Sequence, residues 1–373
     1  MFLASRMLVM VSGYASSPDG RHHGAHGAEV SRALGGEPAG GFLDFSANIN
    51  PLGPPEGALY AAQKALIGEV AAYPDGRYPE LCAALAGYLG VSEETVLPTN
   101  GGAEALFLAA RVAAEGRRGE RAVVLDPTFS EYAAAARAAG FEPESRLARR
   151  REDGFRLDPS VLDDLDGVGV VFLCNPNNPT GDLTPRGEVL SLLERARSAG
   201  ATLVVDEAFA DFAPGEGVAD LVDEHLYVAR SFTKFFAVPG LRLGCLVARN
   251  PDRVRPFQPS WSVNVAAAAA GIAAAGDEYY AAKTLAEVAL RREDLVCALR
   301  TLPGLEVYEG AANFLVVRGP EDLPERLARR GVLVRGCGPF TGLGPRFSRI
   351  AVRGAGENER LVSAVEAALK ETS

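Results

Sequence analysis

Ser231, Thr233, Lys234 and Arg242 lie within twelve residues and bring two hydroxyls, an amine and a guanidinium to one bend of the chain. Lysine is almost never fully buried, so the amine of an isolated lysine is expected in water. Lys234 instead follows a short apolar run, residues 226–229, and lies between threonine and phenylalanine. A buried lysine loses its charge easily, and its neutral amine can form a Schiff base with a carbonyl group. The stretch predicts covalent chemistry at Lys234 if other parts of the chain enclose it.

Other positions carry groups that could complete such a site. Asp206 ends an apolar run and supplies a carboxylate, whereas Asn178 follows another apolar run and supplies an amide. The small-residue turn at Gly102 and Ala103 opens a helix, whose first backbone N–H groups lack partners and lie at the positive end of the helix dipole. Such a helix start can seat a phosphate group, although a run of Asn and Gly is equally typical of an ordinary loop.

Alternating strand and helix patterns predict the scaffold for these groups. Near-continuous apolar runs are typical of parallel strands covered on both faces, and they occur at residues 122–125, 168–174, 202–207, 226–229 and 243–248. This βαβ alternation predicts an α/β fold with a doubly wound, mostly parallel sheet. Ligands of such sheets bind at the carboxyl ends of the strands. Gly102, Phe129, Asn178, Asp206 and Lys234 follow predicted strands or begin helices, so we expect them in one site.

The last third of the chain has a different pattern. Helical stretches at residues 263–275 and 277–302 precede four short apolar strands and a final helix from about residue 357. This order predicts a smaller α+β domain. We therefore expect an N-terminal arm at residues 1–50 that contributes to the small domain and the substrate site, a large domain at 51–258 and a small domain at 259–373.

Composition narrows the class of protein. The net charge is −10, which argues against a nucleic-acid surface, and the basic run Arg149-Arg150-Arg151 is too short to change that. The five cysteines are scattered and lack metal-site spacing, so we expect free thiols, no metal and a reducing, cytoplasmic compartment. The N-terminus resembles a signal peptide only faintly, because Arg6 interrupts its apolar run. No apolar run is long enough to predict a membrane span.

Three motifs, in this order and spacing, resemble the fold-type I pyridoxal-phosphate aminotransferase superfamily: Asn178-Pro179-Thr180-Gly181, Asp206-Glu207-Ala208-Phe209 and Ser231-Phe232-Thr233-Lys234. Further stretches resemble one family within it, the L-threonine-O-3-phosphate decarboxylases of cobalamin biosynthesis, which are related to the histidinol-phosphate aminotransferases. These stretches are His26-Gly27, residues 44–54, Trp261-Ser262-Val263-Asn264, Arg335-Gly336-Cys337 and residues 349–353. The resemblance extends over about residues 22–370.

The resemblance implies a pyridoxal-phosphate cofactor and a role for each candidate residue. Lys234 would carry the cofactor covalently, and Asp206 would face the pyridine nitrogen and keep it protonated, which makes the ring an electron sink. Asn178 would bind the ring oxygen and Phe129 would stack on the ring, although a phenylalanine after a strand is also ordinary core filling.

The resemblance also places the cofactor phosphate. The backbone N–H groups of Gly102 and Ala103 would bind it, and the side chains of Ser231 and Arg242 would add donors. Tyr73 would reach the same phosphate from a second subunit. The resemblance therefore implies a homodimer with shared active sites.

For the substrate, the resemblance implies a phosphorylated amino acid. Arg349 would hold the α-carboxylate, and Arg335, His26 and Asn48 would bind the substrate phosphate. His23 competes with His26 for this role, because each is followed by glycine. Arginines in surface salt bridges and an asparagine in a turn are the ordinary alternatives.

The implied reaction is decarboxylation of L-threonine O-3-phosphate to (R)-1-aminopropan-2-yl phosphate. A histidinol-phosphate-type aminotransferase that uses 2-oxoglutarate is the alternative. Phe209 stands where many aminotransferases have a tyrosine, which slightly favours the decarboxylases. Ser231-Phe232-Thr233-Lys234 also matches the S-x-x-K motif of penicillin-binding hydrolases, but the companion S-D-N and K-T-G motifs are absent.

Overall fold

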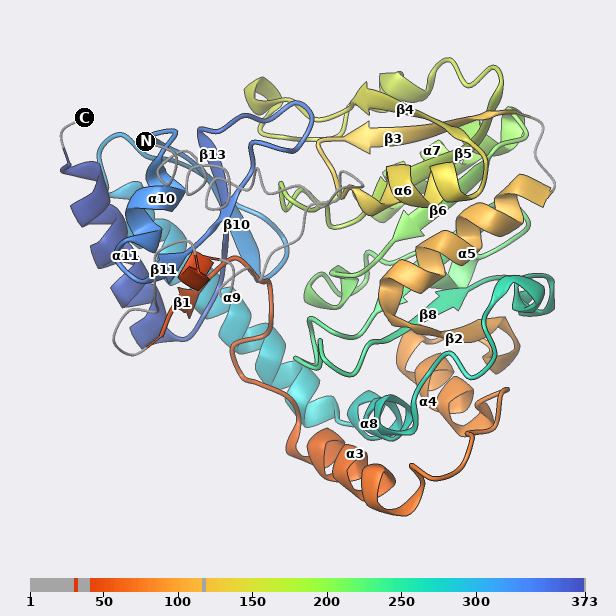
Figure 1. Cartoon of the computed structure of the whole chain (residues 1–373). Coiled ribbons are helices and arrows are strands. Elements are labelled where there is room, and N and C mark those ends of the chain that lie inside the picture. Colours follow the sequence, from red (N-terminus) through yellow and green to blue (C-terminus); the bar gives the residue numbers. More distant parts are fainter. Residues whose placement is uncertain (1–29, 33–40, 116–118, 372–373) are drawn as a thin grey trace.

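The computed structural model describes residues 30–32, 41–115 and 119–371. A seven-stranded sheet in the order β2-β8-β7-β6-β5-β3-β4 runs through the larger part of the molecule (Figure 1). Its strands are β2 (Val96–Asn100), β3 (Arg121–Asp126), β4 (Glu142–Leu147), β5 (Val168–Cys174), β6 (Thr202–Asp206), β7 (Leu226–Ser231) and β8 (Leu243–Val247). All pairs from β7 through β6, β5 and β3 to β4 are parallel. The predicted α/β fold with a mostly parallel sheet is confirmed.

Strand β8 is the exception, because it runs antiparallel to both β2 and β7. Only residues 232–242 separate β7 from β8, and a parallel crossover needs a dozen or more residues, usually with a helix. The chain therefore turns back on itself. That tight turn carries Lys234 at the carboxyl end of β7.

Apolar side chains of the central strands alternate between the two faces of the sheet. Val171 and Leu173 of β5 pack on the face covered by α7 (Arg186–Ser198). Val170 and Phe172 pack on the opposite face with α5 (Gly101–Glu115) and α6 (Glu131–Ala138). Because both faces are covered, the strands have no polar face and appear in the sequence as near-continuous apolar runs.

A second, antiparallel sheet has the order β12 (Arg335–Gly336), β13 (Phe347–Ala351), β10 (Phe314–Arg318) and β9 (Glu306–Tyr308). It lies beside three helices at the other side of the molecule (Figure 1), α9 (Glu278–Arg300), α10 (Leu323–Ala328) and α11 (Ala355–Leu369). The short strand β1 (Leu43–Asp44) pairs in parallel with β11 (Val332–Leu333). Leu43 and Asp44 are therefore attached to this second half of the fold.

Three helices pack together at the lower end of the molecule in Figure 1. They are α3 (Glu56–Gly68), α4 (Pro79–Leu89) and α8 (Val265–Ala275), and α8 packs against both others. Helix α3 was not predicted, because its buried positions are alanines while its larger apolar side chains face outward. The division of the chain at residues 50 and 258 stays a prediction.

The described residues hold three further general features. None of their helices combines the length and the apolar character that a bilayer crossing requires. All five cysteines are free thiols, as predicted, and only Cys297 is exposed. No cluster of histidine, cysteine, aspartate and glutamate in the described ranges is arranged to hold a metal ion.

Candidate active site

One cavity of about 600 Å³ opens at the carboxyl ends of the central strands, between the two sheets. Among the described residues, all the predicted site residues except Tyr73 line it: Asn48, Gly102, Ala103, Phe129, Asn178, Asp206, Ser231, Lys234, Arg242, Arg335 and Arg349. They come from segments up to 300 residues apart, so the fold and not the chain order brings them together.

Lys234 lies in the wall of this cavity with its amine half-buried. Its Nζ donates a hydrogen bond to Ser231 Oγ at 3.2 Å and lies 5.9 Å from the centre of the Phe209 ring. Burial lowers the pKa of Lys234 below its ordinary value, and the opposing effect of Asp206 is smaller. The surroundings therefore favour the neutral, nucleophilic amine. Phe209 has no hydroxyl to donate, as noted from the sequence.

Asp206 ends strand β6 and is 5% exposed. Its Oδ2 accepts a hydrogen bond from the Tyr132 hydroxyl at 2.7 Å, and its Oδ1 accepts one from the Ala208 N–H at 3.0 Å. Burial raises the pKa of Asp206, while these partners and the charge of Lys234 act in the opposite direction. Tyr132 was missed by the sequence interpretation, although it lies in the first turn of α6, three residues after Phe129.

The start of α5 has the features of an anion-binding site. Gly101 has φ +76°, and a Cβ there would lie 2.5 Å from Arg242 Nη2. A Cβ at Gly102 would lie 3.0 Å from the Ser231 Cβ. Glycine is therefore required for Ser231 and Arg242 to approach the first N–H groups of this 15-residue helix. Backbone donors, a hydroxyl and a guanidinium converge where a phosphate would bind.

Arg335 and Arg349 lie directly opposite each other on the neighbouring strands β12 and β13, and both are buried. Burial, with the nearby charge of Arg335, lowers the pKa of Arg349 to about 10, so its guanidinium remains cationic at neutral pH. Arg349 donates to Asn178 Oδ1 and to the Ser46 carbonyl oxygen, and its Nε has no hydrogen-bond partner among the described residues.

Neither hydrogen-bond partner of Arg349 carries a charge, and the carboxylate of Asp44 has only the smallest of the effects on its pKa. Like charges directly opposite on paired strands repel each other. A buried cation without a counter-charge is costly. Arg349 therefore suits an anionic ligand in the cavity.

The two asparagines before residue 51 have different roles. Asn48 lines the cavity, and its Oδ1 has no hydrogen-bond partner among the described residues. Asn50 points away and donates to the Phe235 carbonyl oxygen at 2.8 Å, while its N–H donates to the Lys234 carbonyl oxygen at 3.1 Å. Asn50 therefore anchors the lysine turn, and its Oδ1 also caps a local turn at Leu52 N. The sequence interpretation missed this anchoring role.

Tyr73 is 79% exposed and lies outside the cavity, stacked on Trp261 with the ring centres 4.3 Å apart. His26 and its competitor His23 fall outside the described residues. Glu131 and Phe340 line the cavity without having been predicted, and Phe340 lies 5.8 Å from the Arg335 guanidinium.

The comparisons of this chain with known proteins agree with one another. The family model for aminotransferase class I and II matches residues 41–367. Threonine-phosphate decarboxylase of Salmonella typhimurium is 39% identical over 361 residues, which cover 92% of this chain and 95% of that protein.

Two solved structures resemble the fold. Histidinol-phosphate aminotransferase from Clostridium acetobutylicum superposes with a TM-score of 0.80 at 26% identity, over 87% of this chain and 98% of that chain. L-threonine-O-3-phosphate decarboxylase from Porphyromonas gingivalis superposes with a TM-score of 0.73 at 26% identity, over 88% and 99%.

Proposed function

The chain belongs to the aminotransferase class I and II family, and from this premise we propose that it is a pyridoxal-phosphate-dependent lyase. Its substrate would be L-threonine O-3-phosphate, and its products (R)-1-aminopropan-2-yl phosphate and CO₂, as a step of cobalamin biosynthesis. The likeness to the Salmonella decarboxylase supports this choice. The observation that carries it is the buried Arg349, which lacks an ion-pair partner among the described residues and shares one cavity with Lys234 and Asp206. The free thiols support a cytoplasmic site of action.

The residues present fit the cofactor. The glycine-lined start of α5 with Ser231 and Arg242 suits its phosphate, and the buried carboxylate of Asp206 suits a protonated pyridine nitrogen. Phe129 would stack on the ring, and the Asn178 amide would bind the ring oxygen. When bound, pyridoxal phosphate supplies an electron sink for a bond that breaks at the substrate α-carbon.

The chain's own groups would then bind and orient the substrate. Arg349 would hold the α-carboxylate, while Arg335, Asn48 and His26 would bind the phosphate. The departing carboxylate loses its charge as CO₂ forms, so an ion pair with it is stronger in the ground state than in the transition state and adds no rate by itself. Arg349 would therefore act by orientation. The Lys234 amine would take up the proton that the substrate ammonium group gives up and donate it to the α-carbon after CO₂ leaves.

The test is to incubate purified protein and pyridoxal phosphate with L-threonine O-3-phosphate and to measure both CO₂ and glutamate. CO₂ release without any 2-oxoacid supports the lyase. Glutamate formed from histidinol phosphate and 2-oxoglutarate, with no CO₂ from threonine phosphate, would overturn it. That second candidate is favoured by the fold likeness to the Clostridium aminotransferase.

Replacing Arg335 by glutamine is expected to raise KM for threonine phosphate by about 30-fold or more, because a buried charged partner of the phosphate is lost. The effect on unphosphorylated L-threonine should be much smaller, since that substrate has no phosphate to bind. Steady-state CO₂ release with both substrates measures the ratio. Arg346→Gln, an exposed change before β13, is the control. An equal loss for both substrates would contradict phosphate binding by Arg335.

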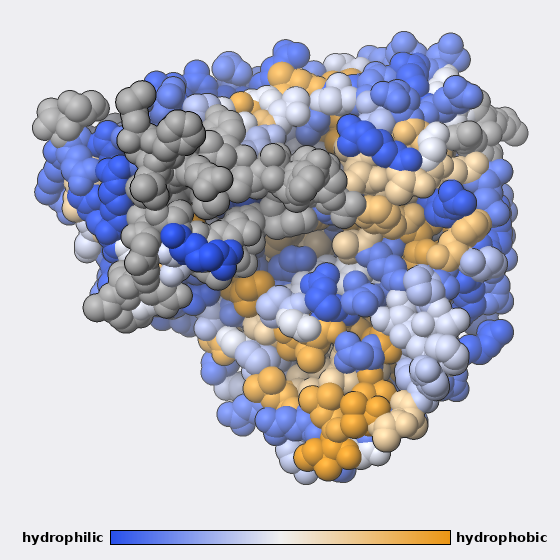
Figure 2. All heavy atoms as spheres, viewed as in Figure 1, coloured by the Kyte–Doolittle hydropathy of each residue, from blue (hydrophilic) through white to orange (hydrophobic). Residues whose placement is uncertain are grey.

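We also propose a homodimer. Figure 2 shows apolar side chains gathered over the helix at the lower end of the molecule, α3, where Leu66 is 51% and Ile67 87% exposed. Tyr60, Val70 and Tyr73 continue this patch. Such an area on a globular protein marks an interaction surface, and a second copy seated here would bring Tyr73 toward a neighbouring site.

Glutamates at Leu66 and Ile67 are expected to weaken self-association by about 10-fold or more, because charges would be buried without partners. Sedimentation velocity across a concentration series measures the dissociation constant. Leu290→Glu, at an exposed leucine of α9, is the matched control. A wild-type protein that sediments as a monomer at micromolar concentration would refute the dimer.

A further inference from the structure

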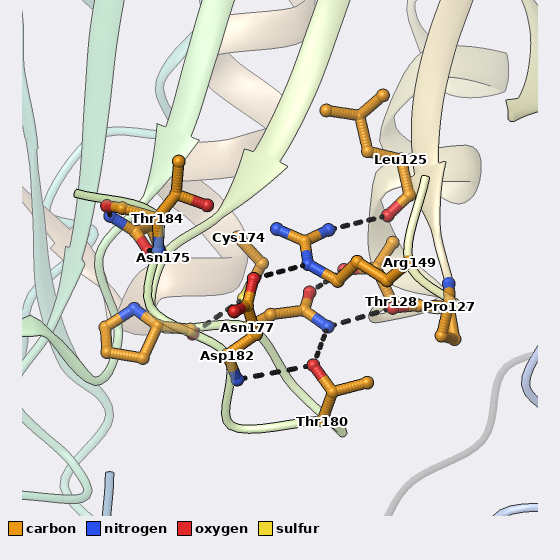
Figure 3. A network of polar contacts seen from close by, with 11 residues as sticks. Leu125, Pro127, Thr128, Arg149, Cys174, Asn175, Asn177, Thr180, Asp182 and Thr184 are labelled. Carbon is orange, nitrogen blue, oxygen red and sulfur yellow. Dashed lines mark hydrogen bonds and ion pairs between the residues drawn. The ribbon is translucent and has the colours of Figure 1, made fainter. Parts of the chain in front are cut away.

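The loop after β5, which carries Asn178, is held by a buried polar network (Figure 3). Asn177 is fully buried, and its Nδ2 donates to the Pro127 carbonyl oxygen at 2.9 Å and to Thr180 Oγ1 at 2.8 Å. Its Oδ1 accepts from Thr128 Oγ1 at 2.9 Å. This single amide therefore ties the loop to the connection between β3 and α6.

Arg149 ties the same two segments a second time. Its side chain has no exposed surface. Its Nη1 donates to the Leu125 carbonyl oxygen at 3.2 Å, and its Nε lies 3.2 Å from Asp182 Oδ2. Asp182 closes the loop, because its carbonyl oxygen accepts from the Asn177 N–H at 2.7 Å. Figure 3 shows the guanidinium between the end of β3 and this loop.

Stability alone does not explain why Arg149 and Asp182 form a buried ion pair. Desolvation of two charges offsets most of their attraction, and two well-packed apolar residues in the same place often stabilise a protein as much or more. A guanidinium has donors in a rigid plane, so it fixes the relative position of the groups it contacts. The pair is therefore better explained by the geometry it imposes.

That geometry fixes the positions of two residues in the wall of the cavity. Thr128 precedes Phe129, and Asn177 precedes Asn178; the first member of each pair faces the network, and the second lines the cavity. Thr128, Arg149 and Asn177 do not line the cavity, whereas Cys174, which Figure 3 also draws, does. The network thus determines the separation of the ring of Phe129 and the amide of Asn178 without contacting a ligand.

We propose that Arg149 is a positioning residue of the active site, acting with Asp182 through Thr128 and Asn177. The inference rests on the proposed function, in which Phe129 and Asn178 hold the cofactor ring. A displacement of about 1 Å in a positioning group can lower a rate by about 10²-fold. Arg149 belongs to the basic run Arg149-Arg150-Arg151, which by its charge alone did not indicate a function.

The test compares full-length Arg149→Met, Asp182→Asn and the double variant with Leu192→Ala, a buried leucine of α7. Each single variant leaves one member of the pair buried without its partner, so its thermal midpoint should fall. The double variant should recover much of that loss. Despite this recovery, the double variant should bind pyridoxal phosphate about 10-fold more weakly than the wild-type protein does. The visible circular dichroism of its bound cofactor should also differ from that of the wild type. Absorbance titration and dichroism of the loaded protein give both values.

Leu192→Ala should lower the thermal midpoint and leave affinity and dichroism unchanged. Thr128→Val removes one hydrogen bond and no charge; it should weaken cofactor binding by about 3- to 10-fold and serves if the charge variants do not fold. If the double variant and Thr128→Val both bind the cofactor with wild-type affinity and show wild-type dichroism, this inference is overturned while the proposed function stands. Wild-type protein that does not bind pyridoxal phosphate would overturn the proposed function and this inference with it.

Discussion

Lys234→Ala is expected to lower the rate of CO₂ release by at least about 10³-fold, because both the covalent anchor of the cofactor and the proton donor at the α-carbon are lost. Burial lowers the pKa of Lys234, which favours the neutral amine that forms the covalent anchor. The alanine variant should fold, because Lys234 is half-buried beside the cavity and its amine donates a hydrogen bond to Ser231.

The matched control is Lys283→Ala, an exposed lysine of α9 that should keep full activity. Besides CO₂ release, borohydride reduction followed by peptide mass spectrometry locates the cofactor attachment. Among the four lysines, which also include Lys64 and Lys370, the added mass should be found on Lys234 alone. Attachment elsewhere, or an active alanine variant, would exclude the assigned role.

Asp206→Asn should lower the rate by about 10²- to 10³-fold, as expected when a preorganised charge beside the reacting group is removed. The amide keeps the shape of the side chain and can still accept the Tyr132 hydroxyl, so the fold should persist. What is lost is the counter-charge of a protonated pyridine nitrogen. The visible absorbance of the bound cofactor should change with the rate.

Asp220→Asn, whose carboxylate forms an exposed pair with Arg186 on the outer side of the large sheet, is the control and should be unchanged in both measurements. If Asp206→Asn keeps its wild-type rate and spectrum, the carboxylate does not face the pyridine nitrogen. If Asp206→Asn binds less cofactor but the cofactor that stays bound has the wild-type spectrum, the carboxylate contributes only to cofactor affinity.

Strong local patterns allowed much of the fold to be predicted. Strand β5 was predicted with its observed bounds, because it is a continuous apolar run. Strands β2 and β4 were missed, because β2 contains Pro98 and β4 is mostly polar. Both lie at the edges of the sheet, where proline and polar residues are tolerated.

The cavity residues were predictable for a different reason. Gly102, Asn178, Asp206 and Lys234 are placed by the topology of the sheet, which brings the ends of parallel strands to one edge. Tyr132 and Arg149 act through contacts to segments that are distant in the sequence, and no spacing in the sequence encodes such contacts.

The site also clarifies the serine that matched a hydrolase motif. Ser231 Oγ does lie within hydrogen-bond distance of Lys234 Nζ. However, Ser231 is the last residue of strand β7 and not the first turn of a helix, and its hydroxyl faces the start of α5. This placement suits a phosphate ligand better than a nucleophile.

The neutral setting of Arg349 has a practical consequence for assays. Because oxygens of Asn178 and Ser46 hold its guanidinium in place, an incoming anion has no acidic side chain to displace within the described ranges of the chain. Sulfate, acetate or inorganic phosphate from a buffer would meet the same preformed cation, with Arg335 beside it, as the substrate does. Kinetic constants measured in such buffers would therefore include competitive inhibition by the buffer itself.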